Sequence, residues 1–215
     1  MLRTFSVSFL FIVLLSSCGS GGERTAVDTV VSDTLAHVPD RPVYQAVYAA
    51  ILSKAEPLNI PAWISVDSVG SNRYALEHQE ALVVFPDGFG IPEEVNVFAF
   101  ATHEVNDSTR AVWYKMEVQG SSNSDIWVVL YGDDGVLAAN LVATKGVGEG
   151  YGKIDSPTSI RQVFIQPGEK MMVTTKVVSI ENGRFVTSNE QPSTFGDADH
   201  LQEVKAKALI EKFFE

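Results

Sequence analysis

The feature that most constrains this chain is a series of short apolar runs separated by turn residues, from about residue 62 to residue 187. Stretches such as Asp133-Asp134-Gly135 and Glu181-Asn182-Gly183 stand between the runs, and their glycines supply the positive φ that tight hairpin turns require. Many short strands with short connections predict an antiparallel meander, which closes as a sandwich, a barrel or a strongly curved sheet. The predicted strands are 62–67, 81–85, 95–102, 111–118, 126–131, 136–144, 160–165, 171–180 and 184–187.

Helical patterns flank this β-rich region. Asp40 is placed to cap a helix whose apolar residues recur at helical spacing from Tyr44 to Ala55, and Pro57 ends it. A second apolar stripe at helical spacing runs from Asp199 to Glu215 and predicts a docked C-terminal helix. The expected fold class is therefore mainly β with flanking helices (α+β), in one globular domain spanning residues 40–215.

Alternation along the strands predicts which side chains face solvent. In the strand 111–118, Val112 and Tyr114 fall on one face and Trp113 on the other, more polar face. The strand 126–131 is apolar on both faces and is expected near the centre of the sheet. Trp113, with Trp127 or Tyr131 on a neighbouring strand, is a candidate aromatic binding surface for a glycan or a peptide; the alternative is that these rings stabilise the sheet.

The N-terminal residues have the pattern of a secretory signal. Arg3 supplies the positive charge, and the apolar run Phe5–Leu15 is too short to cross a membrane, which takes roughly 20 residues. The next residues, Leu15-Ser16-Ser17-Cys18, resemble the lipobox of bacterial lipoproteins: a branched apolar residue, two small residues and a cysteine.

This resemblance implies that residues 1–17 are a signal peptide and that Cys18 carries diacylglycerol. Two or three acyl chains anchor stably because each buried CH₂ contributes about 0.8 kcal/mol. Residues 18–39, rich in glycine and polar side chains, then form a flexible tether. Gly19, in the place where an aspartate signals inner-membrane retention, implies the outer membrane, with the periplasmic or surface face left open.

A looser resemblance joins residues 44–190 to small, uncharacterised β-rich lipoproteins of the Bacteroidota, through the segment Pro57-Leu58-Asn59-Ile60-Pro61 and the Asp-Gly hairpin. That family has no assigned activity. Four Asp-Ser/Thr pairs also resemble the O-glycosylation pattern of the Bacteroides group, and they make candidate acceptors of Thr29, Thr34, Ser68 and Ser108. Turn and cap chemistry accounts for the same pairs equally well.

Charge and residue spacing argue against several functions. The formal net charge is −11, and removal of residues 1–17 leaves 15 basic against 27 acidic side chains, a net charge of −12, so nucleic-acid binding is not expected. The single cysteine and the four histidines have no metal-binding spacing, and no metal or cofactor is predicted. The glycine-rich stretch 146–153 matches no phosphate-binding motif and is interpreted as a loop between strands.

The sequence therefore predicts a lipid-anchored envelope protein of unknown specific activity that acts as a non-enzymatic binding or assembly module. Its expected partners are the membrane, through Cys18, and envelope proteins or glycans. The alternative is an envelope hydrolase acting on glycans, whose carboxylates converge only in the fold, and no catalytic residue is assigned.

Overall fold

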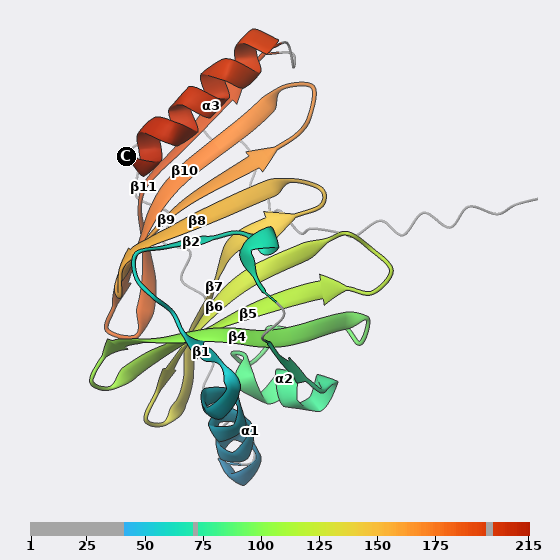
Figure 1. Cartoon of the computed structure of the whole chain (residues 1–215), viewed down its shortest axis with the longest axis vertical. Helices are drawn as coiled ribbons and strands as arrows, with labels where there is room; N and C mark the ends of the chain where they lie inside the picture. The colour runs from blue at the N-terminus through green and yellow to red at the C-terminus, as the bar shows by residue number, and fades with distance from the viewer. Residues whose placement is uncertain (1–40, 71–72, 197–199) are drawn as a thin grey trace, which may run out of the picture. The chain divides into compact units, whose positions relative to one another are not determined.

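The computed structural model describes residues 41–70, 73–196 and 200–215, and their fold is mainly β, with one helix before the sheet and one after it (Figure 1). The meander runs from β4 to β11 with antiparallel neighbours throughout. Within the described residues β1 and β11 end the sheet and do not pair with each other, so the sheet is open.

The helices are α1 (Arg41–Lys54), α2 (His78–Val84), α3 (His200–Phe214) and the 3-10 turn η1 (Val66–Ser68). The strands are β1 (Glu56–Pro57), β2 (Ala62–Ile64), β3 (Tyr74–Leu76), β4 (Val95–Asn106), β5 (Thr109–Val118), β6 (Ser124–Gly132), β7 (Gly135–Lys145), β8 (Glu149–Ser156), β9 (Ser159–Gln166), β10 (Met171–Glu181) and β11 (Arg184–Phe195).

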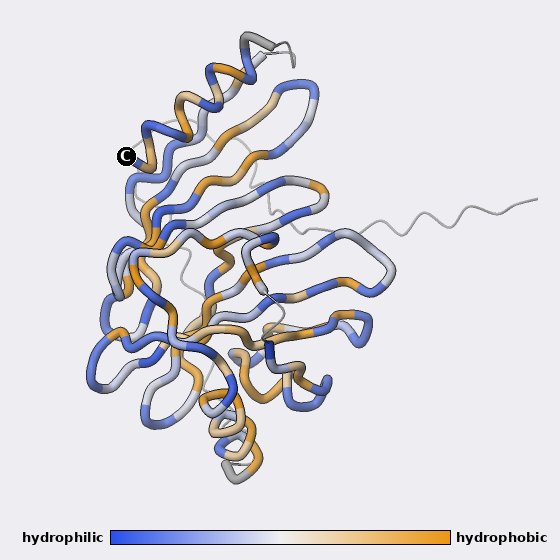
Figure 2. The backbone as a smooth tube through the Cα atoms, viewed as in Figure 1, coloured by the Kyte–Doolittle hydropathy of each residue, from blue (hydrophilic) through white to orange (hydrophobic). Residues whose placement is uncertain are grey.

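One face of β4, β5 and β6 is covered by α1 and α2. Apolar residues recur along these helices at helical spacing, and they bury Ile51 and Val84 completely against the strands. Stacked tyrosines dominate this core, with the rings of Tyr48 and Tyr131 4.7 Å apart. The hydropathy colouring of Figure 2 shows the hydrophobic residues of α1 and of the strands beside many hydrophilic hairpin turns.

The other face of the same strands is covered by the second half of the meander. β7 pairs with β8 at Thr144–Gly150 and Lys145–Glu149, and β2 pairs with the following residues of β8. The middle of β7 instead lies over β8 and β9, where Gln162 Nε2 donates to the carbonyl oxygen of Leu141 over 3.1 Å. A second apolar core fills the space between these layers, which gives the sheet a sandwich-like arrangement. Its fully buried members include Ala111, Trp113, Ile126, Val128, Leu130, Val142, Ile154 and Ile160.

Two predicted elements are wrong in type. The apolar run 81–85 was expected as a strand, but residues 78–84 form α2, which begins with a capping box between Glu77 and Glu80. The stretch 146–153 was expected as a loop, but β8 begins at Glu149, and Gly150 and Gly152 lie inside it. A Cβ at Gly152 would lie 2.4 Å from Val142 Cγ1, so glycine is required here by close packing between strands.

The C-terminal helix α3 packs on the face of β8–β10 that points away from the second core. Ala206 and Phe214 are buried there with Val163 and Val173. Residues 1–40, which include the predicted signal peptide, Cys18 and the tether, lie outside the described residues. No helix in the described ranges is long and apolar enough to cross a membrane.

Candidate functional site

The predicted aromatic surface of Trp113, Trp127 and Tyr131 does not exist as a surface. Trp113 is 0% exposed and Tyr131 1% exposed, because helices cover one face of β5 and β6 and the second strand layer covers the other. The prediction that Trp113 lies on the more polar face is therefore wrong. Trp127 is half-buried, and its ring meets that of Phe89 edge-on at 4.7 Å.

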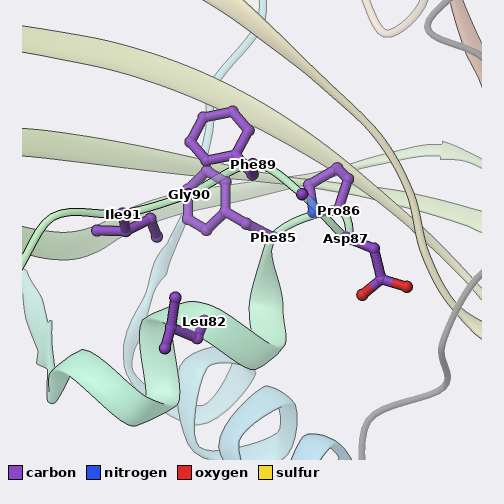
Figure 3. Close-up of a pocket in the computed structure, with 8 residues that line it drawn as sticks. Leu82, Phe85, Pro86, Asp87, Phe89, Gly90 and Ile91 are labelled. Atoms are coloured by element: carbon purple, nitrogen blue, oxygen red, sulfur yellow. The ribbon is translucent and has the colours of Figure 1, made fainter.

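A shallow depression lies beside this contact, in the loop that follows α2 (Figure 3). It holds about 290 Å³ of space, part of which is open solvent, and most of its lining residues are apolar, although its exposed surface is more polar than apolar. The rings of Phe85 and Phe89 lie 4.7 Å apart within it, and Asp87 points away from them. Glycoside hydrolysis needs two carboxyl groups across a cleft, and Asp87 is the one acidic residue of this lining. The depression therefore does not favour the hydrolase hypothesis.

The candidate glycosylation residues divide between described and undescribed parts of the chain. Thr29 and Thr34 lie outside the described residues. Ser68 and Ser108 are exposed, and each hydroxyl makes a local turn contact: Ser68 Oγ donates to the carbonyl oxygen of Ser65 over 2.7 Å, and Ser108 Oγ donates to Asn106 Oδ1 over 3.1 Å. These contacts fit turn and cap chemistry, and glycosylation stays a prediction.

The most exposed aromatic ring with a defined setting belongs to Trp63, in the short strand β2. Its side chain is 57% exposed, although tryptophan is on average a highly buried residue. β2 is fixed by pairing with β8, which sets Trp63 opposite Lys153, and by the neighbouring Ile64, which is buried in the second core. The indole also meets the ring of Phe214 edge-on, with 4.6 Å between centroids.

Lys153 lies beside this indole, and it belongs to a group of charged side chains that are engaged with one another and with α3. Lys153 Nζ lies 5.6 Å from the Trp63 ring centroid and donates to the Phe214 carbonyl oxygen over 3.1 Å. Arg161 Nη1 donates to the Phe213 carbonyl oxygen over 2.6 Å. Two cations thus meet the negative end of the α3 dipole, which stabilises the docked helix.

Asp155 completes the arrangement between the two cations. It accepts from Arg161 Nε over 2.6 Å and from Nη2 over 2.9 Å, and Lys153 Nζ lies 3.5 Å away. The bidentate hydrogen bond from Arg161 lowers the pKa of Asp155 below its usual value, and the same bond raises the pKa of Arg161. We call Trp63, Lys153, Asp155, Arg161 and Phe214 the Trp63 surface.

Sequence reasoning missed the Trp63 surface. Trp63 lay in a predicted strand, 62–67, but alternation cannot say which face of a short strand is covered by the rest of the fold. The available signal was the prolines at positions 57 and 61, which indicate that this segment does not lie in the middle of a sheet. The role of Arg161 could not be predicted from the sequence, because one of its partners, the Phe213 carbonyl oxygen, lies at the end of α3.

In the part of the chain that the structure describes, no group of three or more His, Cys, Asp or Glu side chains is placed to hold a metal ion. Comparisons with known protein families, with characterised proteins and with solved structures found no match to this chain.

Proposed function

We propose that this chain is a lipid-anchored protein of the bacterial cell envelope, held at the outer membrane by acyl groups on Cys18. Its β-rich domain acts as a non-enzymatic binding or assembly module. The anchoring part of the proposal rests on the sequence Leu15-Ser16-Ser17-Cys18 and the apolar run before it.

The binding part rests on one observation, the exposure of Trp63 on a rigid support. Tryptophan is enriched among the residues that contribute most to binding, because a large ring is buried at a small cost in conformational entropy. The Phe214 ring, 4.6 Å away, and Lys153 Nζ, 5.6 Å from the indole centroid, both contact the Trp63 ring and restrict its movement. A ring ordered in advance loses less entropy on binding than a free one.

The anchor is tested by metabolic labelling with palmitate in the wild type and in Cys18→Ser. Label in the wild type and none in the variant is the expected result, and equal label in both would overturn the anchoring proposal. Binding is tested by pull-down from detergent-solubilised envelope with the wild type, Trp63→Ala and Val147→Ala. Val147 is 85% exposed and lies in the β7–β8 turn, so its truncation serves as a matched control.

A second candidate function is assembly through the edge strand β11. Among the described residues β11 pairs with β10 alone, and residues 186–192 are exposed. Pro192 and Asn189, whose φ is 52°, interrupt the second half of this edge, while Arg184–Ser188 carries neither feature and exposes Val186 at 42%. Light scattering of the full chain in detergent micelles tests assembly: Val186→Lys should dissociate an oligomer formed by edge pairing.

A further inference from the structure

The Trp63 surface carries two positive side chains, Lys153 and Arg161, and one negative side chain, Asp155, and all three are engaged by partners inside the domain. Arg161 gives three of its donors to Asp155 and to the Phe213 carbonyl oxygen, and Lys153 is occupied by the Phe214 carbonyl oxygen and by Asp155. An anionic ligand would have to compete with these bonds, and it would approach a chain whose formal net charge is −11. Anions are therefore poor candidates for this surface.

Hydrogen-bonding capacity nevertheless remains beside the indole. An ammonium group has three donors and a carboxylate has about four acceptor positions. Lys153 uses donors on Phe214 and Asp155, and Asp155 accepts from Arg161 and Lys153. The side chains of Lys153 and Asp155 are 21% and 30% exposed, so the unused positions can be reached from solvent.

The surface thus offers one flat aromatic ring beside polar groups that are already engaged inside the domain. A sugar ring has the complementary chemistry, with C–H groups on one face and hydroxyl groups around the edge that both donate and accept. An extended peptide also carries N–H donors and C=O acceptors, but they are spaced along its backbone and not around the edge of one flat ring. A membrane surface would favour unpaired cations, which this arrangement lacks.

We infer that the Trp63 surface binds a neutral sugar ring of an envelope glycan, with the ring stacked on the indole and its hydroxyl groups bonded to Lys153 and Asp155. The inference rests on the proposed function as a binding module and names the ligand class for it. Because no net charge is exchanged, binding should depend little on salt.

The test uses the full chain in detergent micelles and chitotetraose, a neutral oligomer of N-acetylglucosamine, with maltotetraose as a second neutral probe. Calorimetry and the fluorescence of the exposed indole report binding. We expect one of these probes to bind the wild type, Trp63→Ala to weaken binding by about tenfold or more, and Trp63→Phe to keep most of it. Asp155→Asn should weaken binding severalfold, and Val147→Ala should leave it unchanged.

The outcomes separate this inference from the proposal beneath it. Unfolding curves of each variant in urea show whether Trp63→Ala is folded, and Trp63→Phe keeps the test valid if it is not. Absence of binding of both neutral probes, binding unaffected by Trp63→Ala, or loss of affinity at high salt would overturn the glycan inference. Loss of a protein partner from Trp63→Ala in the pull-down, with no glycan bound, would overturn it while leaving the binding module in place. The palmitate-labelling result depends on Cys18 alone, so it tests the anchoring proposal separately from glycan binding.

Discussion

The indole Nε1 of Trp113 donates a hydrogen bond to Nδ1 of His103 over 3.0 Å, between β5 and β4 in the interior of the domain. An indole N–H can only donate, so Nδ1 of His103 must be the acceptor and the imidazole proton resides on Nε2. Nε2 in turn lies 3.1 Å from the carbonyl oxygen of Pro157, to which it donates. This link joins the first half of the meander to the β8–β9 turn.

The link predicts that the domain loses stability in mild acid. Burial lowers the pKa of His103 below its usual value of 6.5, although the bond to Pro157 opposes the shift. Between the folded pKa and 6.5 the unfolded chain binds more protons, so stability is complete above about pH 6.5 and falls as the pH drops through the folded pKa. Protonation of His103 also adds a proton to Nδ1. This new N–H faces the N–H of Trp113, so the hydrogen bond between the two rings is lost. Urea midpoints measured at about pH 7.5 and about pH 5 should show this loss.

His103→Gln provides the comparison for that experiment. The variant should be less stable than the wild type at about pH 7.5, because the buried Trp113 donor loses its fitted acceptor, at a cost of about 1–3 kcal/mol. It should also show a smaller change between the two pH values. An equal change with pH in the variant and the wild type would assign the acid sensitivity to other groups.

A second buried link predicts unequal costs for two tyrosine hydroxyls. Tyr131 Oη donates to the carbonyl oxygen of Val84 over 2.5 Å, so the hydrogen bond to Tyr114 Oη, also 2.5 Å, has Tyr114 as its donor. Burial raises the pKa of both hydroxyls, which therefore stay protonated. Tyr131→Phe leaves both the Val84 oxygen and the Tyr114 hydroxyl without this partner, whereas Tyr114→Phe leaves only an unused acceptor.

We expect Tyr131→Phe to cost about 1–3 kcal/mol and Tyr114→Phe about 0.5–1.5 kcal/mol of unfolding free energy. Urea unfolding at neutral pH measures both losses. Each substitution removes only a hydroxyl group and leaves the ring in place, so the difference reports on the hydrogen bonds. Equal losses, or the larger loss in Tyr114→Phe, would contradict the direction of donation.

The meander and both terminal helices could be predicted from the sequence, because hydrophobic periodicity and turn residues are local signals. The run 81–85 shows where such signals end, since a short apolar run fits a buried helix as well as a strand. Residues 149–152 were missed as strand because their glycines reduce apolar periodicity. Their purpose, the close approach of Val142 and Phe164, depends on partners far away in the chain.

The candidate site depended even more on tertiary structure. Alternation along β5 correctly separated Tyr114 from Trp113 onto different faces, but it could not show that a second strand layer covers Trp113. Trp63 is the reverse case, since it belongs to a three-residue strand whose outward face is left uncovered. Exposure of an aromatic ring is a property of the assembled layers and not of the local pattern.

The partly buried charge of Lys176 destabilises the folded domain, so its removal should raise the free energy of unfolding. It is half-buried in β10, with Nζ 5.2 Å from the centroid of the Phe164 ring. Burial lowers its pKa below 10.5, and Glu190 only partly opposes the shift. The unfolded chain therefore binds the proton more tightly, and the folded state gains stability as the pH rises toward 10.5.

Lys176→Met keeps the apolar stem and removes the charge, so its urea midpoint at about pH 7 should exceed that of the wild type, and the difference should shrink near about pH 10. Lys207→Met is the matched control because Lys207 is 78% exposed, and it should stay within about 0.5 kcal/mol of the wild type. A lower midpoint for Lys176→Met would mean that attraction to Phe164 and Glu190 outweighs desolvation.

The crossing of β7 over β8 predicts a steric conflict that a second substitution relieves. A Cβ at Gly152 would lie 2.4 Å from Cγ1 of Val142, which is 0% exposed, so Gly152→Ala should cost about 1–3 kcal/mol by overpacking. Val142→Ala should also destabilise, by leaving a cavity. In the double variant the new methyl group occupies space that the valine has vacated. The unfolding free energy lost by the double variant should therefore be at least about 1 kcal/mol smaller than the sum of the two single losses.

Gly70→Ala, where a Cβ meets nothing within 4 Å, is the control for the backbone effect of alanine alone. Additive losses in a urea-unfolding cycle would show that Val142 and Gly152 are not in contact, and would contradict the layered packing of β7 on β8.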